Sequence, residues 1–188
     1  MFDLSPATDR LAGLVRDVTD GDLAAPTPCP DYTVGDLLDH INGLSVAFTM
    51  AALKTPLTGA GSGDASRLPS DFRESVPQRL AELAKAWQAP QAWEGMTAAG
   101  GVDLPGEVAG AVALDEIVLH GWDLARATGR PFDVEEDLLQ VVYGFVSSVP
   151  ADQRDGSLFG PAVEVGSNAP LLDRVVGLSG RNPAWGLG

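Results

Sequence analysis

The sequence contains little cysteine and little positive charge, and each scarcity excludes a class of protein. Its 188 residues include a single cysteine, Cys29. No internal disulfide can therefore form, and we expect a reducing, cytoplasmic compartment. Twelve Lys and Arg residues stand against 26 Asp and Glu residues, a formal net charge of −14. Such a surface repels phosphate backbones, which argues against a nucleic acid partner.

Long hydrophobic runs are also missing. No segment approaches the roughly 20 apolar residues that a membrane helix needs. The N-terminal stretch "MFDLSPATDRLAGLV" has neither the basic start nor the continuous apolar core of a signal peptide. We therefore expect a cytoplasmic protein without a membrane partner.

Histidine is scarce as well, because the chain has only His40 and His120. The second lies in "ALDEIVLHGWDLARATGR", where Glu116, His120 and Asp123 recur at i, i+4 and i+7 of an apolar helical run. A helix that is apolar on nearly all sides is buried, so Glu116 and His120 need partners. Either they form a salt bridge with each other, or both bind one metal ion.

Helical periodicity dominates the chain and predicts an all-α protein, an up-down four-helix bundle with an irregular C-terminal tail and a short terminal helix. The helices are expected at about Ser5 to Asp20, Val34 to Lys54, Phe72 to Trp87, Pro105 to Gly129, Val134 to Ser148 and Leu171 to Leu178. Ser5 is the expected N-cap of the first helix, followed by Pro6. We expect one domain over 1–188, with the bundle in about 1–150 and an extension in about 151–188.

The segments between these helices show no convincing alternating strand pattern. The stretch "GPAVEVG" (160–166) is at most one short extended piece. The Gly-, Ser- and Pro-rich segment from Thr55 to Ser70 is predicted to be a mobile surface loop.

His40 is the natural candidate for a third ligand. It lies at the margin of the apolar stripe of its helix, on a side with the small residues Gly43, Ala47 and Ala51. That side leaves room for close helix approach or for a cavity. If the two helices are neighbours, His40 joins the Glu and His pair in a site with an open position, as in catalytic rather than structural metal centres. The alternative is two unrelated, hydrogen-bonded histidines.

Two acids could orient the candidate ligands. Asp123 lies one turn after His120 and could accept its imidazole N–H, the usual way in which a metal-binding histidine is held, or could pair with Arg126. Asp36 lies one turn before His40 and could do the same, although a capping box with Thr33 also explains it.

Three other residues are interpreted structurally. Cys29 is more than about 10 Å from His40 along the chain path, so it is predicted to be a small buried hydrophobic residue and not a ligand. Tyr32 is predicted to pack at the start of its helix with the hydroxyl at the surface. Trp122 is predicted to be a packing residue.

Two segments, "TPCPDYTVGDLLDHINGL" and "ALDEIVLHGWDLARATGRPF", resemble hallmark segments of actinobacterial DinB-like proteins. The tail "PLLDRVVGLSGRNPAW" resembles the ending of a short-chain branch of this group. The superfamily is a metal-binding four-helix bundle, and the nearer relatives are the mycothiol-dependent maleylpyruvate isomerase N-terminal domains. The resemblance implies that His40, Glu116 and His120 bind a divalent metal ion, with zinc as the usual metal and nickel as an alternative.

The resemblance also implies a function. It suggests a mycothiol-dependent thiol S-transferase or isomerase that acts on a small electrophile, as a monomer or homodimer. The isomerase relatives carry a further C-terminal domain, for which we expect no counterpart here, so the likeness argues for the site more than for the reaction. The alternative is a non-catalytic, metal-binding stress or structural bundle protein.

Overall fold

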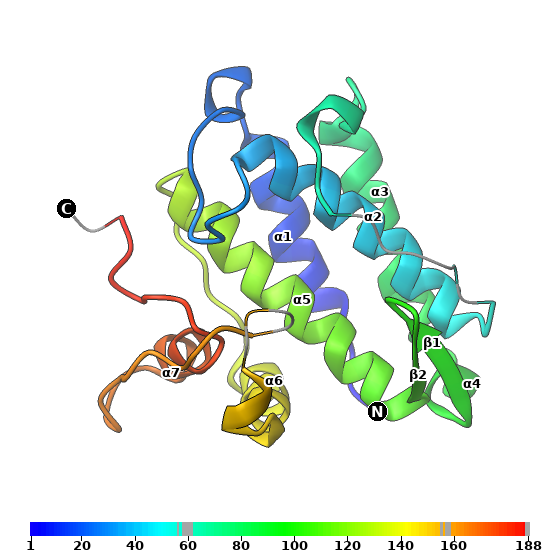
Figure 1. Ribbon diagram of the computed structural model, residues 1–188. Coiled ribbons are helices and arrows are strands. Elements are labelled where there is room, and N and C mark those ends of the chain that lie inside the picture. Colours follow the sequence, from blue (N-terminus) through cyan, green and yellow to red (C-terminus); the bar gives the residue numbers. More distant parts are fainter. Residues whose placement is uncertain (56, 58–61, 155, 157–158, 187–188) are drawn as a thin grey trace.

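The computed structural model describes residues 1–55, 57, 62–154, 156 and 159–186, and most of them are helical (Figure 1). The α-helices are α1 (Ser5–Asp17), α2 (Val34–Ala52), α3 (Phe72–Ala86), α4 (Pro90–Trp93), α5 (Gly106–Ala127), α6 (Glu136–Ser148) and α7 (Leu171–Leu178). Short 3-10 turns cover Asp20–Asp22, Ala65–Arg67 and Ala151–Gln153. The two strands are β1 (Met96–Ala99) and β2 (Val102–Pro105).

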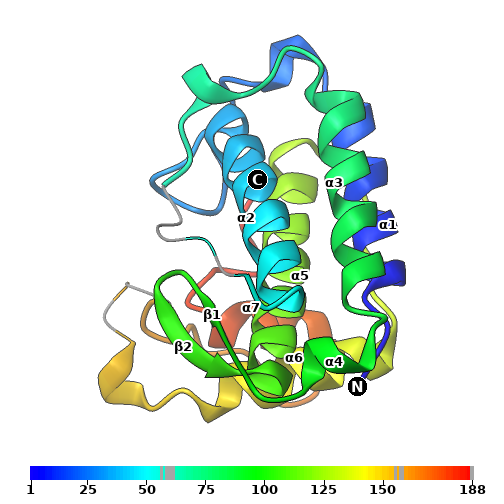
Figure 2. The ribbon, with the colours of Figure 1, turned by 90° about the vertical axis from the view of Figure 1, so that its right-hand side faces the viewer.

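Helices α1, α2, α3 and α5 form the bundle, each packed against two of the others (Figure 2). Helix α6 packs against α5, and α7 packs against α6, so the C-terminal part of the chain lies at one end of the bundle (Figure 1). The predicted all-α bundle is confirmed. Among the described residues, none of the helices is both long and apolar enough to cross a membrane.

Helix α5 is the central element, as its composition predicts. Most of its residues are buried, including Leu114, Val118 and Leu124 at 0% exposure. Its C-terminus is closed by Gly129, whose φ of +65° suits a residue without a Cβ. The Arg130 N–H donates to the Ala125 carbonyl at 2.8 Å in the geometry of a Schellman motif, which fixes the end of the helix.

Helix α2 begins with the predicted capping box. The Asp36 N–H donates to the Thr33 hydroxyl, and the Thr33 N–H donates to the Asp36 carboxylate at 2.9 Å. The segment predicted as a mobile loop falls partly on 56 and 58–61, which lie outside the described residues. Its later part docks on α2: the Ala65 N–H donates to Asp36 and the Asp64 N–H to Asp39.

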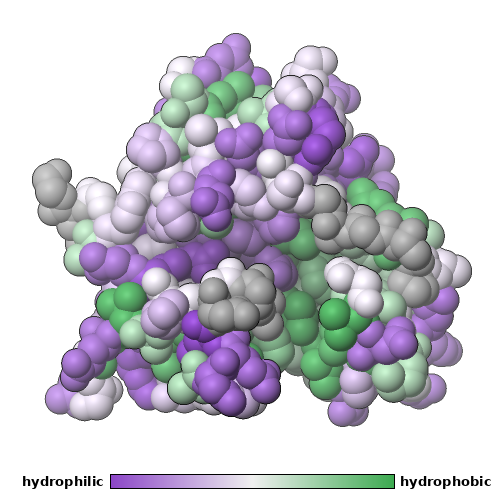
Figure 3. All heavy atoms as spheres, viewed as in Figure 1, coloured by the Kyte–Doolittle hydropathy of each residue, from purple (hydrophilic) through white to green (hydrophobic). Residues whose placement is uncertain are grey.

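The prediction that the chain has no strands is wrong. Met96–Ala99 and Val102–Pro105 pair antiparallel, and Gly100 and Gly101 between them have φ of +59° and +81°. Two consecutive positive-φ residues are what a two-residue hairpin turn of type I′ requires, and Gly-Gly provides them. Met96 and Val102 of this hairpin are exposed hydrophobic residues. Hydrophobic residues gather on the face shown in Figure 3 (green, lower right).

One smaller expectation changes. Ser5 is not the cap of α1 but its first residue, and its N–H and hydroxyl both donate to the Asp3 carboxylate. The stretch 160–166 forms no strand, which agrees with the expectation of at most a short extended piece, and the Val163 N–H donates to the Gly177 carbonyl of α7.

Candidate metal centre

The three predicted ligands converge in space. His40 on α2 and Glu116 and His120 on α5 each offer a ligand atom, and these atoms all lie within 4.8 Å of one another. The two helices are neighbours in the bundle, which brings together residues that are far apart along the chain. The rings of His40 and His120 meet edge to face, with centroids 4.9 Å apart.

Glu116 and His120 also contact each other directly. His120 Nε2 lies 2.9 Å from Glu116 Oε2, as the i, i+4 spacing permits. Burial alone would lower the pKa of His120, but its hydrogen bonds with Asp123 and Glu116 outweigh burial and raise the pKa to about 9. Burial raises the pKa of Glu116, whereas the contact with His120 outweighs it and holds that pKa below its usual value.

Asp123 is fully buried behind His120. Its Oδ2 lies 3.1 Å from His120 Nδ1, so the carboxylate holds the ring nitrogen that faces away from Glu116. The cation that pairs with Asp123 is Arg181, not the Arg126 considered from the sequence. Arg181 Nε donates to Oδ1 at 2.8 Å and Nη2 to Oδ2 at 2.9 Å, a bidentate pair.

The sequence analysis missed Arg181, because it follows α7 and lies 58 positions after Asp123. Local pattern contains no signal for such a contact. Its Nη1 also donates to the Ser179 hydroxyl at 3.1 Å. Although burial raises the pKa of Asp123, the positive charge of Arg181 outweighs this effect and holds the pKa below its usual value.

Asp115 was also missed. It directly precedes Glu116, is only 1% exposed, and its Oδ1 has no hydrogen-bond partner in the part of the chain that the structure describes. Burial, followed by the charge of Glu116, raises the pKa of Asp115 well above its usual value. A carboxylate inside a buried helix was itself a signal in the sequence, since such groups are rarely buried without a partner.

The candidate ligands line a cavity of about 370 Å³. Its wall includes the start of α2 and the loop before it, one side of α5, and the C-terminal segment; the lining residues not yet placed are Cys29, Asp31, Tyr32, Ser62, Leu119, Gly156 and Phe159. On the face shown in Figure 3, hydrophilic residues gather across the middle of the molecule. The cavity is large enough for a small molecule beside the ligands.

One of the structural interpretations, that of Cys29, is wrong. Tyr32 packs against the core as predicted, its part-buried hydroxyl accepts the Gly63 N–H at 3.0 Å, and its ring lies 5.3 Å from that of His40. Cys29 is only half-buried and lines the cavity; burial, and then the charge of Asp123, raises the pKa of its thiol. Trp122 is 2% exposed in the core, so its packing role is confirmed.

The contacts of Asp36 hold the start of α2. Its carboxylate accepts the Thr33 N–H and hydroxyl and the Ala65 N–H. These bonds lower the pKa of Asp36, and the bond from the Thr33 hydroxyl has the largest effect. The capping role is confirmed, and an additional role in orienting His40 stays a prediction.

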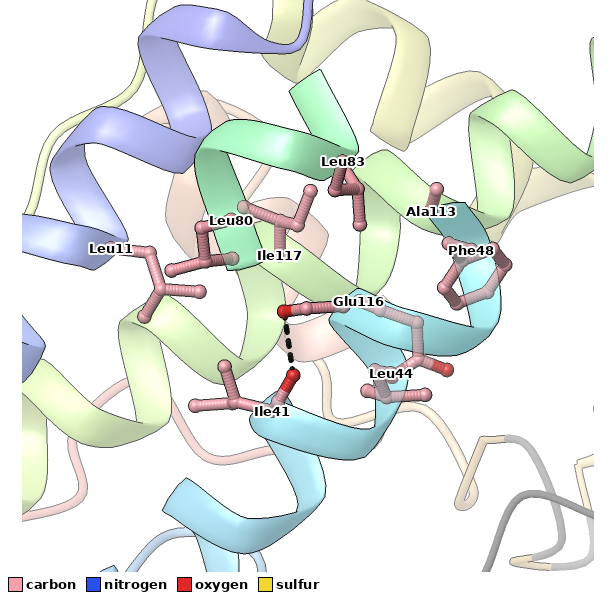
Figure 4. Close-up of a pocket in the computed structure, with 10 residues that line it drawn as sticks. Leu11, Ile41, Leu44, Phe48, Leu80, Leu83, Ala113, Glu116 and Ile117 are labelled. Carbon is pink, nitrogen blue, oxygen red and sulfur yellow. Dashed lines mark hydrogen bonds between the residues drawn. The ribbon is translucent and has the colours of Figure 1, made fainter. Parts of the chain in front are cut away.

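On its other side Glu116 meets the apolar core. A second cavity of only about 10 Å³, about the room of one water molecule, lies between α1, α2, α3 and α5, and Glu116 is on its wall among leucine, isoleucine and phenylalanine side chains (Figure 4). The Ser45 hydroxyl there donates to the Ile41 carbonyl at 2.7 Å. Glu116 is thus confined to the boundary between a polar cavity and a dry interior.

The residues present suit a divalent ion. Two imidazole nitrogens and a carboxylate are donors that zinc and nickel accept, and a three-residue set leaves coordination positions open. The orientation of His120 by a buried carboxylate is the arrangement that metal-binding histidines use.

Fold and site together define a class, a helical bundle with two histidines and a glutamate gathered at one cavity. The family model for the mycothiol maleylpyruvate isomerase N-terminal domain matches residues 4–125, and the chain belongs to that family. The C-terminal segment with Arg181 lies beyond the matched residues.

Relatives support this assignment. Two uncharacterised proteins of Mycobacterium tuberculosis, from strains CDC 1551 and H37Rv, are 29% identical over 135 residues, which is 70% of this chain and 69% of theirs. The crystal structure of the mycothiol-dependent maleylpyruvate isomerase has a similar fold, with a TM-score of 0.70 and 17% identity.

That structural likeness corrects one expectation. It covers 95% of this chain and 88% of the isomerase chain, so most of the isomerase has a counterpart in fold here. The expected absence of a counterpart to its C-terminal region is therefore wrong at the level of the fold.

Proposed function

We propose that this protein binds a divalent metal ion, zinc in the first instance, through His40, Glu116 and His120. We further propose that it binds a low-molecular-weight thiol there, mycothiol by analogy with the family, for transfer to or isomerisation of a small electrophile. The observation that carries the proposal is the approach of the three ligand atoms to within 4.8 Å of one another inside a cavity of about 370 Å³.

The chain's own residues have distinct roles in this proposal. Asp123 holds His120 Nδ1 and so directs Nε2 toward Glu116 and the ion position. Arg181 neutralises Asp123, which allows that carboxylate to stay ionised in the interior. When bound, a divalent ion at this position lowers the pKa of a coordinating thiol and makes its sulfur nucleophilic near neutral pH.

Elemental analysis and activity together test the proposal. Purified protein is expected to contain about one divalent ion per chain, as three-residue sites with such geometry do. It should consume a model electrophile in a thiol-dependent way, and a chelator should abolish that rate. Equal rates with and without chelator would reject the catalytic role. Absence of a stoichiometric ion in protein that retains all three ligand residues would reject the metal centre.

The Glu116–His120 ion pair favours a second candidate function. In that case the site only stabilises the fold of the bundle and has no catalytic role. His120→Ala separates the two. A purely structural role costs folding stability, whereas a catalytic role mainly costs turnover.

A further inference from the structure

Asp115 is a buried carboxylate with one oxygen that lacks a hydrogen-bond partner among the described residues. Among the described residues, Asp115 Oδ1 and Ser75 Oγ are the buried side-chain polar atoms without a hydrogen-bond partner. An unsatisfied carboxylate oxygen costs more to bury than a hydroxyl. We propose that Asp115 recognises a hydroxyl group on the small thiol that binds at the candidate metal centre, an inference that rests on the proposed function.

The position of Asp115 supports recognition of a ligand in the cavity. It lines the same cavity as Glu116 and His120 and precedes Glu116 by one residue on α5. At 1% exposure it is buried in the cavity wall, so only a ligand inside the cavity could come near it. If a molecule is held by its sulfur beside His120, another group of the same molecule could therefore contact Asp115.

The neighbouring cation does not satisfy this oxygen. Arg181 is close enough to interact electrostatically with Asp115, but its Nε and Nη2 donate to Asp123 and its Nη1 to Ser179. Asp115 Oδ1 is left without a donor, which native structures rarely tolerate unless a water or ligand completes the site.

A hydroxyl suits this position better than an anionic group. It can donate to a carboxylate oxygen or accept from a protonated carboxyl, so it fits Asp115 in either form. An anion would be repelled by Asp31 and Glu116, which line the same cavity. The chemical class is therefore a hydroxylated thiol without a negative charge beside the hydroxyl.

Pairs of thiols that differ only by a hydroxyl in place of a methyl group test the inference. The full chain loaded with Co²⁺ is titrated with 2-mercaptoethanol and propane-1-thiol, and with 3-mercaptopropan-1-ol and butane-1-thiol, while the sulfur-to-cobalt absorption band is followed. For at least one pair, we expect Asp115→Leu to lower the ratio of hydroxythiol to alkanethiol affinity by about tenfold, the effect of one lost hydrogen bond in a closed site. Glu107→Leu, which removes an exposed acid of the same helix outside the cavity, should leave both ratios unchanged.

The outcomes separate the two levels of the proposal. If no thiol produces the band, the proposed thiol-binding function fails and the role of Asp115 fails with it. If the band forms but Asp115→Leu changes neither ratio, only the role of Asp115 is overturned.

A second measurement needs no ligand. Since Oδ1 lacks a partner, Asp115→Leu should raise the melting temperature of the metal-free protein by a few degrees, as replacement of a functional buried acid commonly does. A lower melting temperature would mean that the carboxylate supports the fold, and the inference would be overturned.

Discussion

At the level of single residues, Asp123 is the link between the candidate metal centre and the C-terminal segment. Its Oδ2 contacts both His120 Nδ1 and Arg181 Nη2, and its side chain is fully buried. The orientation of one proposed ligand therefore depends on a residue of the tail. Because the carboxylate and the guanidinium neutralise each other, the pair is tolerated in the interior, where either one alone would not be.

Asp123→Asn tests this link. The substitution keeps the size of the side chain but removes the charge that holds His120 and Arg181. We expect the affinity for Zn²⁺ to fall about 10- to 100-fold, the usual effect of losing such an orienting carboxylate, as measured by competition with a chromophoric chelator. Asp31→Asn, in the same cavity, is the control, and equal affinities of both variants and the wild type would contradict the orienting role.

The protonation of His120 predicts how the metal-free protein responds to pH. Its pKa is about 9 in the folded protein against an ordinary value of 6.5. A raised pKa stabilises the fold fully below about pH 6.5, and this contribution is lost as the pH rises through about 9. We expect the urea midpoint of the metal-free protein to decline between these values. His120→Gln should remove most of the decline, and a midpoint that rises over this range would contradict the assignment.

At the level of elements, the capping box fixes where α2 begins and therefore fixes the position of His40 along the helix. Thr33→Ala removes the hydroxyl that accepts the Asp36 N–H. The expected loss is about 1 kcal/mol, or a melting temperature lower by about 2–4 °C. Thr49→Ala on the same helix removes a hydroxyl that donates to the Ser45 carbonyl within the helix and should cost less. Calorimetry of both variants compares them, and equal losses would argue against the cap.

Elements with strong local signals were predictable from sequence. The bounds of α7 match the prediction at Leu171 and Leu178, and α5 ends before Gly129 as expected. The β1–β2 hairpin was not predicted, because four-residue strands carry too few residues for an alternating pattern. The Gly100–Gly101 pair between them was the available signal.

At the level of the whole molecule, the proposed ion would connect α2 to α5 and should stabilise the entire fold. An ion that binds only the folded chain adds about 2.7 kcal/mol at a free concentration 100 times its Kd. For a chain of this length, we expect a rise of about 5–10 °C in melting temperature with saturating Zn²⁺. His40→Ala should lose this rise while keeping the helical circular dichroism. An equal rise in that variant would place the ion elsewhere.

The candidate site was only partly open to prediction. Glu116 and His120 could be paired because one helix fixes their spacing, and His40 could be added because the chain has one other histidine. Arg181 could not be predicted, because its contact with Asp123 depends on how α7 packs on α6, which in turn packs on α5.

The amino-acid sequence alone determined the all-α class, the main helices and the identity of the three candidate ligands, because helix periodicity, caps and residue scarcity are local properties. Tertiary structure alone decided which side chains share the cavity. It brought Cys29, Tyr32 and Arg181 to its wall and left Asp115 Oδ1 without a partner. The physical reason is that side-chain proximity across elements follows from how helices pack, which no local pattern encodes.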